Sequence, residues 1–474
     1  MQIVHVSAEC YPVAKVGGLA DVVGSLPKYL TRMGIDNKVV MPFYQKPFVE
    51  AHEWEEDYVS YIQMGENRYE YKVLKEKYDV LGFGLYLIQI EHLLDRDQVY
   101  GYHDDTYRFL AFQIAVLDWL NQWEVLPSVV HCHDHQAGLI PFFMKHGLQF
   151  ENLKLIPSII TIHNAAYQGW IKDELLPFFP WFDEEYRASL YWDFTINSLA
   201  CAIRNAWKVT TVSNHYMWEL SQDAHGLESL IRAEYAKCSG IVNGIDTEEW
   251  NPKTDPNLVK NYGVRDFKSG KQANKEWICK EYNLDPKKPL ISFIGRFAAE
   301  KGADLLMESI WNSLRLANQK VNYFIVGNGD SNIENGLRML QEYTKGEVNT
   351  YFGYNEALAR KVYAGSDFLL MPSRVEPCGL NQLYAIRYGT IPITRTVGGL
   401  MDTVIDFDDP DGYGIRFIHA DKHDIAHAVS RAEYLYHNPE RFREIRKRMM
   451  QLDFSWEYSA QMYEDLYESL INVL

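Results

Sequence analysis

Two cations lie five residues apart in the segment GRFAAEKG, residues 295–302. Arg296 could bind a pyrophosphate through parallel hydrogen bonds, and Lys301 could act on the same group as a point charge. The segment follows an apolar run typical of a buried strand, and α/β proteins bind ligands in loops at such strand ends. A solvated loop with both charges in water is the alternative, and the local sequence favours neither.

A third cation, Lys15, precedes the glycine pair Gly17 and Gly18 near the start of the chain. Glycine lets a backbone approach a ligand closely, and the amphipathic segment that follows would offer free N–H groups to an anion. The pattern could hold a phosphate, but taken alone it favours an ordinary tight turn.

Glu376 is followed by a proline in the segment SRVEPCGLNQ, residues 373–382. Proline suits the first turn of a helix, so the backbone N–H groups of Cys378, Gly379 and Leu380 are predicted to face an anion. A carboxylate beside an anion site is unfavourable unless it binds neutral hydroxyl groups, such as those of a sugar. The alternative is that Glu376 only complements the helix dipole. Cys378 lacks an evident partner base and is expected to be a packing residue.

Three histidines alternate in the segment HCHDHQAG, residues 131–138. In a strand, His131, His133 and His135 would lie on one face, which is similar to a metal-binding set. No matching carboxylate or cysteine cluster follows from the spacing, so we expect no metal here. Asp134, at the predicted end of the strand, is the better functional candidate.

Several common motifs are absent from the sequence. It contains no P-loop, GxSxG or HExxH, and the segment GNGDSN lacks the third glycine of a dinucleotide fingerprint. The four segments described above would instead bind a diphosphate, a sugar with several hydroxyl groups and a nucleoside. These are the parts of a nucleotide sugar.

Composition limits the possible partners and compartment. The 474-residue chain carries a formal net charge of −17, which disfavours nucleic acid and anionic membranes as partners. The six cysteines form no CxxC pair, so neither a disulfide scaffold nor a zinc ribbon is expected. The first residues lack a basic leader, and no apolar run reaches about 18 residues. We expect a cytoplasmic protein without a membrane span.

Short apolar runs that end in polar residues alternate with longer amphipathic runs in both halves of the chain. This alternation predicts α/β architecture: two Rossmann-like domains with parallel sheets, facing each other across a cleft. Residues 50–90 predict antiparallel strands added to the first sheet, and residues 239–257 predict a hinge. Strands are predicted at residues 2–8, 37–43, 128–134, 157–164, 208–214, 290–296, 323–329, 350–354, 368–374 and 391–395.

The chain resembles bacterial glycogen synthases and plant starch synthases. The matching motifs run nearly from end to end and include KVGGLADVVGSLP, HCHDHQAGL, TIHNAAYQG, GIVNGIDTEEWNP, GRFAAEKGADLL and MPSRVEPCGLNQLYAIRYGTIPITRTVGGLMDTV. The resemblance implies the GT-B fold. Residues 1–240 would form the acceptor-side domain, residues 241–456 the nucleotide-sugar domain, and the final helix, 457–474, would pack on the first domain.

The resemblance also implies roles for individual positions. His163 would touch the region of the glucose 6-hydroxyl, Glu376 would bind the 3- and 4-hydroxyls, and Tyr354 would pack on the base. The implied catalytic residues are Glu376, Arg296, Lys301, His163 and Asp134. The implied donor-binding residues are Lys15, Gly18, Asp21, Asn164, Asn243, Asp246, Tyr354, Cys378, Gly379, Leu380, Asn381, Gly398 and Gly399.

The implied reaction is transfer of glucose, with retention of configuration and without a metal ion or other cofactor. The donor would be ADP-glucose, with UDP-glucose as the alternative, and the acceptor would be an α-1,4-glucan. Another retaining nucleotide-sugar glycosyltransferase is the rival enzyme, and a non-catalytic glucan-binding protein is disfavoured by the charged residues. The sequence departs from the family at Val16 and Asn381, where threonine is usual, and it leaves the oligomeric state open.

Overall fold

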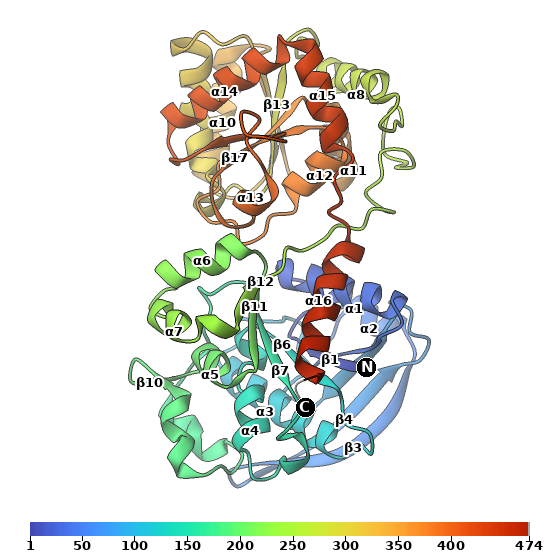
Figure 1. The fold of residues 1–474 in the computed structure, drawn as a ribbon, viewed down its shortest axis with the longest axis vertical. Helices are drawn as coiled ribbons and strands as arrows, with labels where there is room; N and C mark the ends of the chain where they lie inside the picture. Colours follow the sequence, from blue (N-terminus) through green and yellow to red (C-terminus); the bar gives the residue numbers. More distant parts are fainter. Residues whose placement is uncertain (473–474) are drawn as a thin grey trace. The chain divides into compact units, whose positions relative to one another are not determined.

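The computed structural model describes residues 1–472, which form two compact units (Figure 1). Unit 1 contains Met1–Ile241 and the C-terminal segment from Trp456, and unit 2 contains Val242–Ser455. The first boundary therefore falls inside the segment 239–257, whose glycine, asparagine and proline content predicted a hinge. None of the helices in residues 1–472 is long and apolar enough to cross a membrane.

Unit 1 is built on a nine-stranded sheet in which a parallel core carries an antiparallel edge. The antiparallel strands predicted within residues 50–90 are confirmed, because β4 pairs antiparallel with both β3 and β5. The strand order is β12 (Cys238–Gly240), β11 (Lys208–Thr211), β7 (Ser158–Ile162), β6 (Val129–His133), β1 (Gln2–Val6), β2 (Asp36–Pro42), β5 (Gly84–Gln89), β4 (Asn67–Glu76) and β3 (Trp54–Met64).

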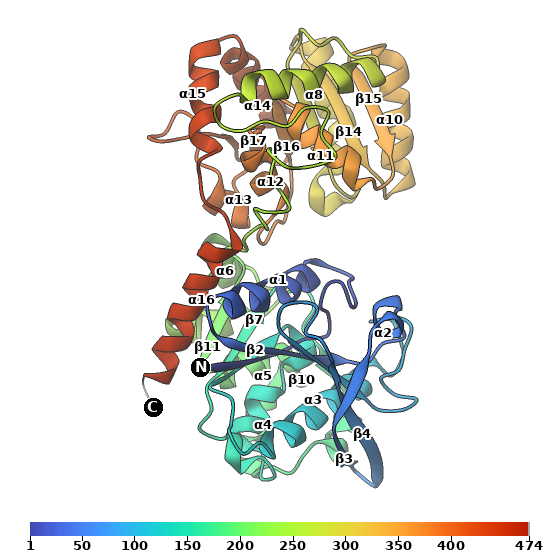
Figure 2. The same cartoon turned by 90° about the vertical axis from the view of Figure 1, so that its right-hand side faces the viewer.

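Two helices from opposite ends of the chain pack together in unit 1. Helices α1 (Gly18–Arg32) and α16 (Trp456–Ile471) lie side by side (Figure 2), and Leu30 and Tyr463 belong to one buried apolar cluster. The predicted helix 457–474 thus corresponds to α16, while residues 473 and 474 lie outside the described residues. The other elements of unit 1 are α2 (Pro47–Ala51), α3 (Asp105–Asn121), α4 (Ile140–His146), α5 (Ser198–Asn205), α6 (Asn214–Gln222), α7 (Glu228–Ala233), β8 (Trp170–Ile171), β9 (Tyr191–Trp192) and β10 (Thr195–Asn197).

Unit 2 contains a six-stranded, all-parallel sheet. Its order is β15 (Val348–Phe352), β14 (Asn322–Gly327), β13 (Leu290–Ile294), β16 (Phe368–Met371), β17 (Ile391–Arg395) and β18 (Ile415–Phe417). The surrounding helices are α8 (Phe267–Glu281), α9 (Leu306–Trp311), α10 (Ser331–Thr344), α11 (Glu356–Gly365), α12 (Asn381–Arg387), α13 (Gly398–Thr403), α14 (Lys422–Tyr436) and α15 (Pro439–Met449).

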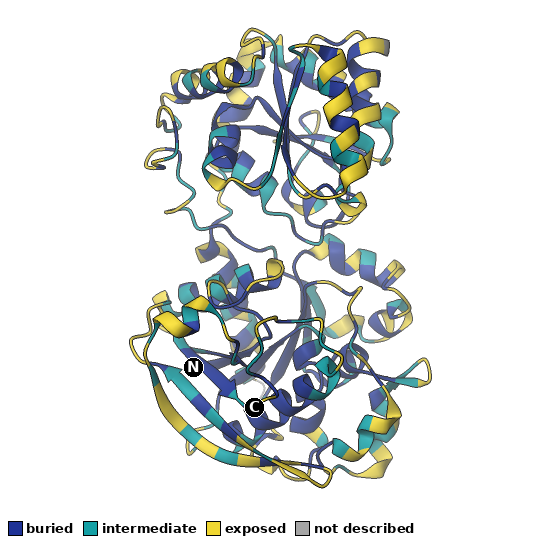
Figure 3. Cartoon of the chain, turned by 180° about the vertical axis from the view of Figure 1, so that it is seen from behind, coloured by how far each residue is buried: buried dark blue, intermediate teal, exposed yellow. Residues whose placement is uncertain are grey.

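The inner strands of both sheets are buried, which agrees with their apolar sequences (Figure 3). In strand β13, LISFI, side chains on both faces are covered because helices pack on both sides of a parallel sheet. Exposed residues gather on the outward faces of the helices and along β3. The prediction of two Rossmann-like domains with parallel sheets is confirmed.

One helix begins later than its sequence predicted. The proline after Glu376 suggested a helix that includes Cys378, but α12 begins at Asn381. Gly379 has a φ of 73°, a left-handed conformation that a right-handed helix cannot continue through. The backbone at residues 378–380 therefore precedes the helix instead of forming its first turn.

Candidate active site

Each sheet has one point where the strand order reverses, and several of the predicted residues follow the strands at these points. In unit 2 the order runs outward from the neighbours β13 and β16, and in unit 1 from the neighbours β1 and β6. Loops at the carboxyl ends of two such strands diverge and leave a crevice for ligands. Lys301 and Glu376 follow β13 and β16, whereas Lys15 and Asp134 follow β1 and β6. The topology thus defines one half-site in each unit.

The half-site of unit 2 is centred on a pair formed by Lys301 and Glu376. The Lys301 Nζ atom donates to both carboxylate oxygens of Glu376, each at 2.8 Å. Ser373 Oγ donates to Glu376 Oε2 at 3.0 Å. The Glu376 side chain is 9% exposed and that of Lys301 is 28% exposed, so the ammonium group retains access to solvent. A cation and an acceptor therefore lie together in one accessible position.

The other two predicted phosphate-binding cations are also paired with carboxylates of their own unit. Arg296 forms an ion pair with Glu300. Lys15 Nζ donates to the two carboxylate oxygens of Asp21 at 2.6 and 2.8 Å. Each cation is thus paired with a carboxylate that lies four to six positions away in the sequence.

The late glycine pair lets two backbone segments approach each other closely. A Cβ atom on Gly398 would lie 2.0 Å from the carbonyl oxygen of Glu376, and one on Gly399 would lie 2.0 Å from that of Cys378. The Gly399 N–H also donates to the Glu376 carbonyl at 3.0 Å. Gly398 and Gly399 therefore shape the Glu376 loop by contact. Burial raises the pKa of Cys378 to about 12, so its thiol stays protonated and unreactive at neutral pH.

Three further predicted residues of unit 2 differ in what they contact. Asn243 is buried, and its Oδ1 atom has no hydrogen-bond partner within the described part of the chain. An orphaned acceptor of this kind is costly unless a ligand satisfies it. Asp246 instead accepts the backbone N–H groups of residues 248 and 249 at 3.0 Å and shapes a turn. Tyr354 is 82% exposed, so its ring can receive a flat ligand.

The side chain of Asn381 is used within unit 2. Its Nδ2 atom donates to the carbonyl of Ile294 at 2.8 Å, and its Oδ1 atom accepts from Tyr363 at 3.0 Å. These contacts tie the start of α12 to the end of β13. They give Asn381 a supporting position, while its predicted contact with the donor stays a prediction. Leu380 is the N-cap residue of α12, and its carbonyl accepts a hydrogen bond from the Tyr384 N–H.

The half-site of unit 1 is centred on Asp134 and His163, at the ends of β6 and β7. The His163 backbone N–H donates to Asp134 Oδ1 at 2.7 Å. Burial raises the pKa of Asp134 to about 7, while backbone N–H groups of His163 and Asn164 oppose the shift and the Glu9 charge adds to it. Asp134 has a φ of 54°, which a non-glycine residue adopts at a cost and which is typical of functional sites. Asn164 forms a turn through Ala166 N–H and is exposed.

Replacing Asp134 with asparagine should stabilise the protein above neutral pH. The native pKa of about 7 exceeds the usual aspartate pKa of 3.8, so the carboxyl favours folding fully below pH 4 and loses that contribution as pH rises through 7. Asparagine stays neutral and keeps the acceptor for the His163 N–H. We expect Asp134→Asn to match wild type near pH 4 and to exceed it at pH 8, by roughly 1.4 kcal/mol per unit of pKa difference. Denaturant unfolding from pH 4 to 8 measures this, and a difference independent of pH would contradict it.

The backbone at Gly17 and Gly18 borders open space. A Cβ atom on either residue would meet no described atom within 4 Å, and neither has a positive φ. Neither crowding nor backbone strain within the chain therefore requires glycine at these positions. The open space above the backbone is what a closely bound ligand needs.

Sequence reasoning missed Glu9, which holds the Lys15 loop. Its Oε2 atom accepts the backbone N–H groups of Val16 at 2.5 Å and Gly17 at 3.0 Å, and its Oε1 atom accepts from Tyr100 at 2.8 Å. The position of this carboxylate just after the first strand was the one sequence feature that could have marked Glu9 as a functional residue. Val16, where the sequence departs from threonine, is 64% exposed.

The three alternating histidines do not share one strand face. Strand β6 ends at His133, and His135 lies in the 3-10 turn that follows. The third member of the histidine cluster is His5 from β1, which lies with His131 and His133 in the core of unit 1. The strand thus ends inside this segment, as its prediction over residues 128–134 implied, and His135 cannot share a strand face with His131 and His133.

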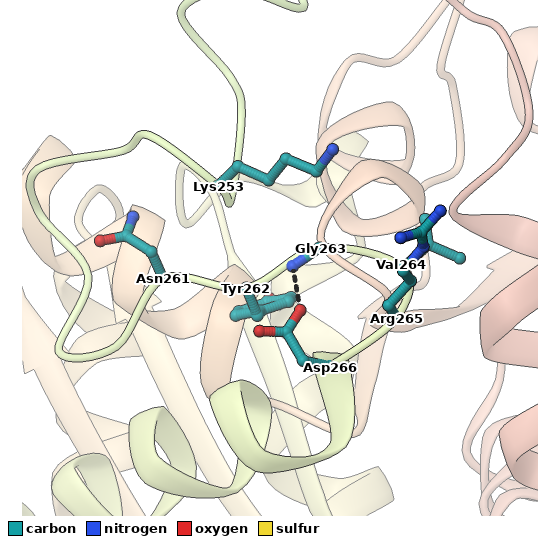
Figure 4. A pocket seen from close by; sticks show the side chains of 7 residues that line it. All are labelled: Lys253, Asn261, Tyr262, Gly263, Val264, Arg265 and Asp266. Carbon is teal, nitrogen blue, oxygen red and sulfur yellow. Dashed lines mark hydrogen bonds between the residues drawn. The ribbon is translucent and has the colours of Figure 1, made fainter.

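A separate pocket lies in unit 2, away from these residues. It has a volume of about 580 Å³ and is lined by Lys253, Asn261, Tyr262, Gly263, Val264, Arg265 and Asp266 (Figure 4). The Gly263 N–H donates to Asp266 at 2.8 Å and closes the turn at its floor. None of the predicted site residues lines this pocket, so its size alone assigns it no role.

Comparisons with known proteins agree with this geometry. Residues 2–233 match the family model "Starch synthase catalytic domain", and residues 274–451 match "Glycosyl transferases group 1". A glycogen synthase of Flavobacterium johnsoniae is 49% identical over 471 residues, covering 99% of both chains. One of Lactobacillus acidophilus is 35% identical and covers 99% of this chain and 100% of the relative.

Solved structures are similar over nearly the whole chain. The catalytic domain of starch synthase IV from Arabidopsis thaliana, bound to ADP and acarbose, has a TM-score of 0.86 and 32% identity, and the match covers 99% of both chains. A sucrose-phosphate synthase from Thermosynechococcus elongatus has a TM-score of 0.62 and 17% identity and is similar in fold alone.

Proposed function

The chain belongs to the family of glycogen synthases and starch synthases, and from this premise we propose that it transfers glucose from ADP-glucose to an α-1,4-glucan. The acceptor atom would be the 4-hydroxyl oxygen at the non-reducing end, and the anomeric configuration would be retained. The related starch synthase IV structure holds ADP and acarbose, which supports a nucleotide diphosphate and a glucan-like chain as ligands.

The pair formed by Lys301 and Glu376 carries this proposal. Negative charge grows on the diphosphate as the bond to glucose breaks, and a preorganised cation stabilises that charge without reorganising. Lys301 lies where the strand order of unit 2 reverses and keeps an accessible ammonium group. Glu376, bonded to Lys301, would accept hydrogen bonds from the glucose hydroxyls and hold the ring against the cation.

The remaining residues extend this arrangement. Arg296 and Lys15 would bind the diphosphate, so side-chain cations supply the balancing charge and the proposal includes no metal ion. Asn243 would satisfy its orphaned Oδ1 with a sugar hydroxyl. We propose that Asp134 and His163 contact the glucose being transferred.

In a single displacement, retention requires the acceptor to attack from the side that the diphosphate leaves. We propose that a leaving phosphate oxygen accepts the proton of the acceptor 4-hydroxyl while the new C–O bond forms and the old one breaks. Atoms and charge then balance without a covalent enzyme intermediate. The protonated Cys378 thiol is consistent with this, because it cannot serve as the nucleophile at neutral pH.

The donor nucleotide is tested by comparing kcat/KM for ADP-glucose and UDP-glucose on a glucan acceptor. We expect ADP-glucose to be favoured at least tenfold, and a preference for UDP-glucose would overturn the donor assignment. Tyr354→Ala is a useful comparison, because an exposed ring stacks on any base. Loss of the ring should lower kcat/KM for both donors by similar factors and leave the ratio of the two values unchanged.

A further inference from the structure

A chain of hydrogen-bonded side chains runs through the core of unit 1 and ends at His163. Asn37 Oδ1 lies 3.3 Å from His5 Nε2, and His5 Nδ1 lies 3.2 Å from His133 Nε2. His133 Nδ1 then lies 3.1 Å from His163 Nε2. The four side chains come from strands β2, β1 and β6 and from the loop after β7, so the fold assembles them across four adjacent strands.

Asn37 sets the direction of every hydrogen bond in this chain. Its Nδ2 atom donates to the carbonyl of Ile35 at 2.9 Å, and a carbonyl can only accept, so the amide cannot be flipped. Its Oδ1 atom therefore faces His5 and must accept from His5 Nε2–H. A neutral imidazole carries one proton, so His5 Nδ1 is left as an acceptor.

The same reasoning fixes the donor and acceptor at each later step of this series of hydrogen bonds. Because His5 Nδ1 accepts, His133 Nε2 must donate, and His133 Nδ1 becomes an acceptor in turn. His163 Nε2 must then donate to it, which leaves His163 Nδ1 as a bare lone pair. No described residue forms a hydrogen bond with His163 Nδ1.

Burial keeps all three rings neutral, which the argument requires. His5 and His133 are fully buried and His163 is 9% exposed. Burial lowers the pKa of His5 to about 4 and that of His163 to about 3. Burial also lowers the pKa of His133 well below its usual value, and its histidine neighbours add to the effect.

The ring nitrogens of the histidine cluster formed by His5, His131 and His133 already have hydrogen-bond partners. His131 stacks on His133 with ring centroids 4.3 Å apart, but its own nitrogens face Thr161 Oγ1 at 2.6 Å and Tyr467 OH at 2.8 Å. Both nitrogens of His5 and of His133 are bonded within the chain described above. A metal ion would have to displace these partners in a fully buried site.

We propose that Asn37, His5 and His133 are positioning residues that hold His163 as its Nε2–H tautomer, so that Nδ1 accepts a hydrogen bond from a substrate hydroxyl. This deepens the proposed function, on which it rests for the sugar being at His163. It also assigns a specificity: a bare lone pair attracts a hydroxyl hydrogen and repels a carboxylate oxygen. The site should therefore take a neutral glucosyl donor and reject a sugar acid that presents a carboxylate at this position.

Two variants at His133 separate tautomer control from simple packing. In His133→Asn the side-chain Oδ1 occupies the position of the original Nδ1 and still accepts from His163. In His133→Leu the volume is similar but no acceptor remains, and both variants lose the contact with His5. We expect kcat of the leucine variant to be at least tenfold below that of the asparagine variant.

The tautomer itself is measured on the full-length wild-type protein labelled with ¹⁵N-histidine, by long-range proton–nitrogen spectroscopy. The His163 signals, assigned with His163→Gln, should show a protonated Nε2 and an unprotonated Nδ1. A protonated Nδ1 in the wild type, or equal kcat in the two His133 variants, would overturn the proposal. The spectrum needs no substrate and neither of the His133 variants, so it stands even if the proposed donor is wrong or if a His133 variant does not fold.

Discussion

Glu376→Ala is expected to lower kcat by about 10²- to 10³-fold, because it removes the carboxylate proposed to hold the glucose ring in its reacting position. The same change leaves the Lys301 ammonium without its two 2.8 Å partners. That ammonium is 28% exposed, so water can replace the lost contacts and the stability cost should be about 1 kcal/mol or less. Steady-state rates with ADP-glucose and a glucan acceptor, together with denaturant unfolding, measure both effects.

A neighbouring ion pair provides the matched control for Glu376. Asp304 accepts from the Arg374 guanidinium at 2.6 and 2.8 Å, and this pair joins the same two loops without touching Glu376. Asp304→Ala should therefore change kcat less than threefold. Glu376→Gln keeps one acceptor oxygen, so its kcat should lie between that of the wild type and that of Glu376→Ala. If Glu376→Ala keeps its fold and its kcat is within threefold of the wild-type value, the proposed role of Glu376 in the site is wrong.

The location of both half-sites could be predicted from the sequence because parallel strands place their carboxyl ends at one edge. Apolar runs such as LISFIGR and FLLMPSR show where strands end, and the polar residues that follow must then lie near each other. Lys301 and Glu376 are 75 positions apart in the sequence, yet their side chains are directly hydrogen-bonded. They lie close together because β13 and β16 are neighbours in the sheet, and the order of strands along the sequence does not by itself determine which strands are neighbours.

The sequence could not show which partner each charged or polar side chain selects. Glu9 bonds two N–H groups of the Lys15 loop, and His133 bonds a residue 128 positions away. Such contacts depend on side-chain directions across neighbouring strands, which hydrophobic periodicity does not encode. The start of α12 was missed for a local reason, since the left-handed Gly379 interrupts a segment whose proline favoured an earlier helix.

Lys301→Ala is expected to lower kcat/KM for the donor by about 10²- to 10³-fold, because the point charge that stabilises the leaving diphosphate is lost. Arg374→Ala, which removes a nearby cation paired with Asp304, is the matched control and should cost less than threefold. Lys301→Arg should rescue poorly, since the planar guanidinium places its nitrogens differently from a single ammonium nitrogen that bonds two carboxylate oxygens.

Inhibition by free ADP separates the role of Lys301 from that of its partner. If Lys301 binds the diphosphate directly, Lys301→Ala should weaken ADP inhibition at least tenfold. Glu376→Ala should leave it unchanged or strengthen it, because removing a carboxylate frees the ammonium for the phosphate. In the double variant the Lys301 effect should persist, whereas a lysine that acts only by orienting Glu376 would have no further effect once the carboxylate is gone. Equal weakening of ADP inhibition by both single variants would contradict a direct phosphate contact, because the two residues carry opposite charges.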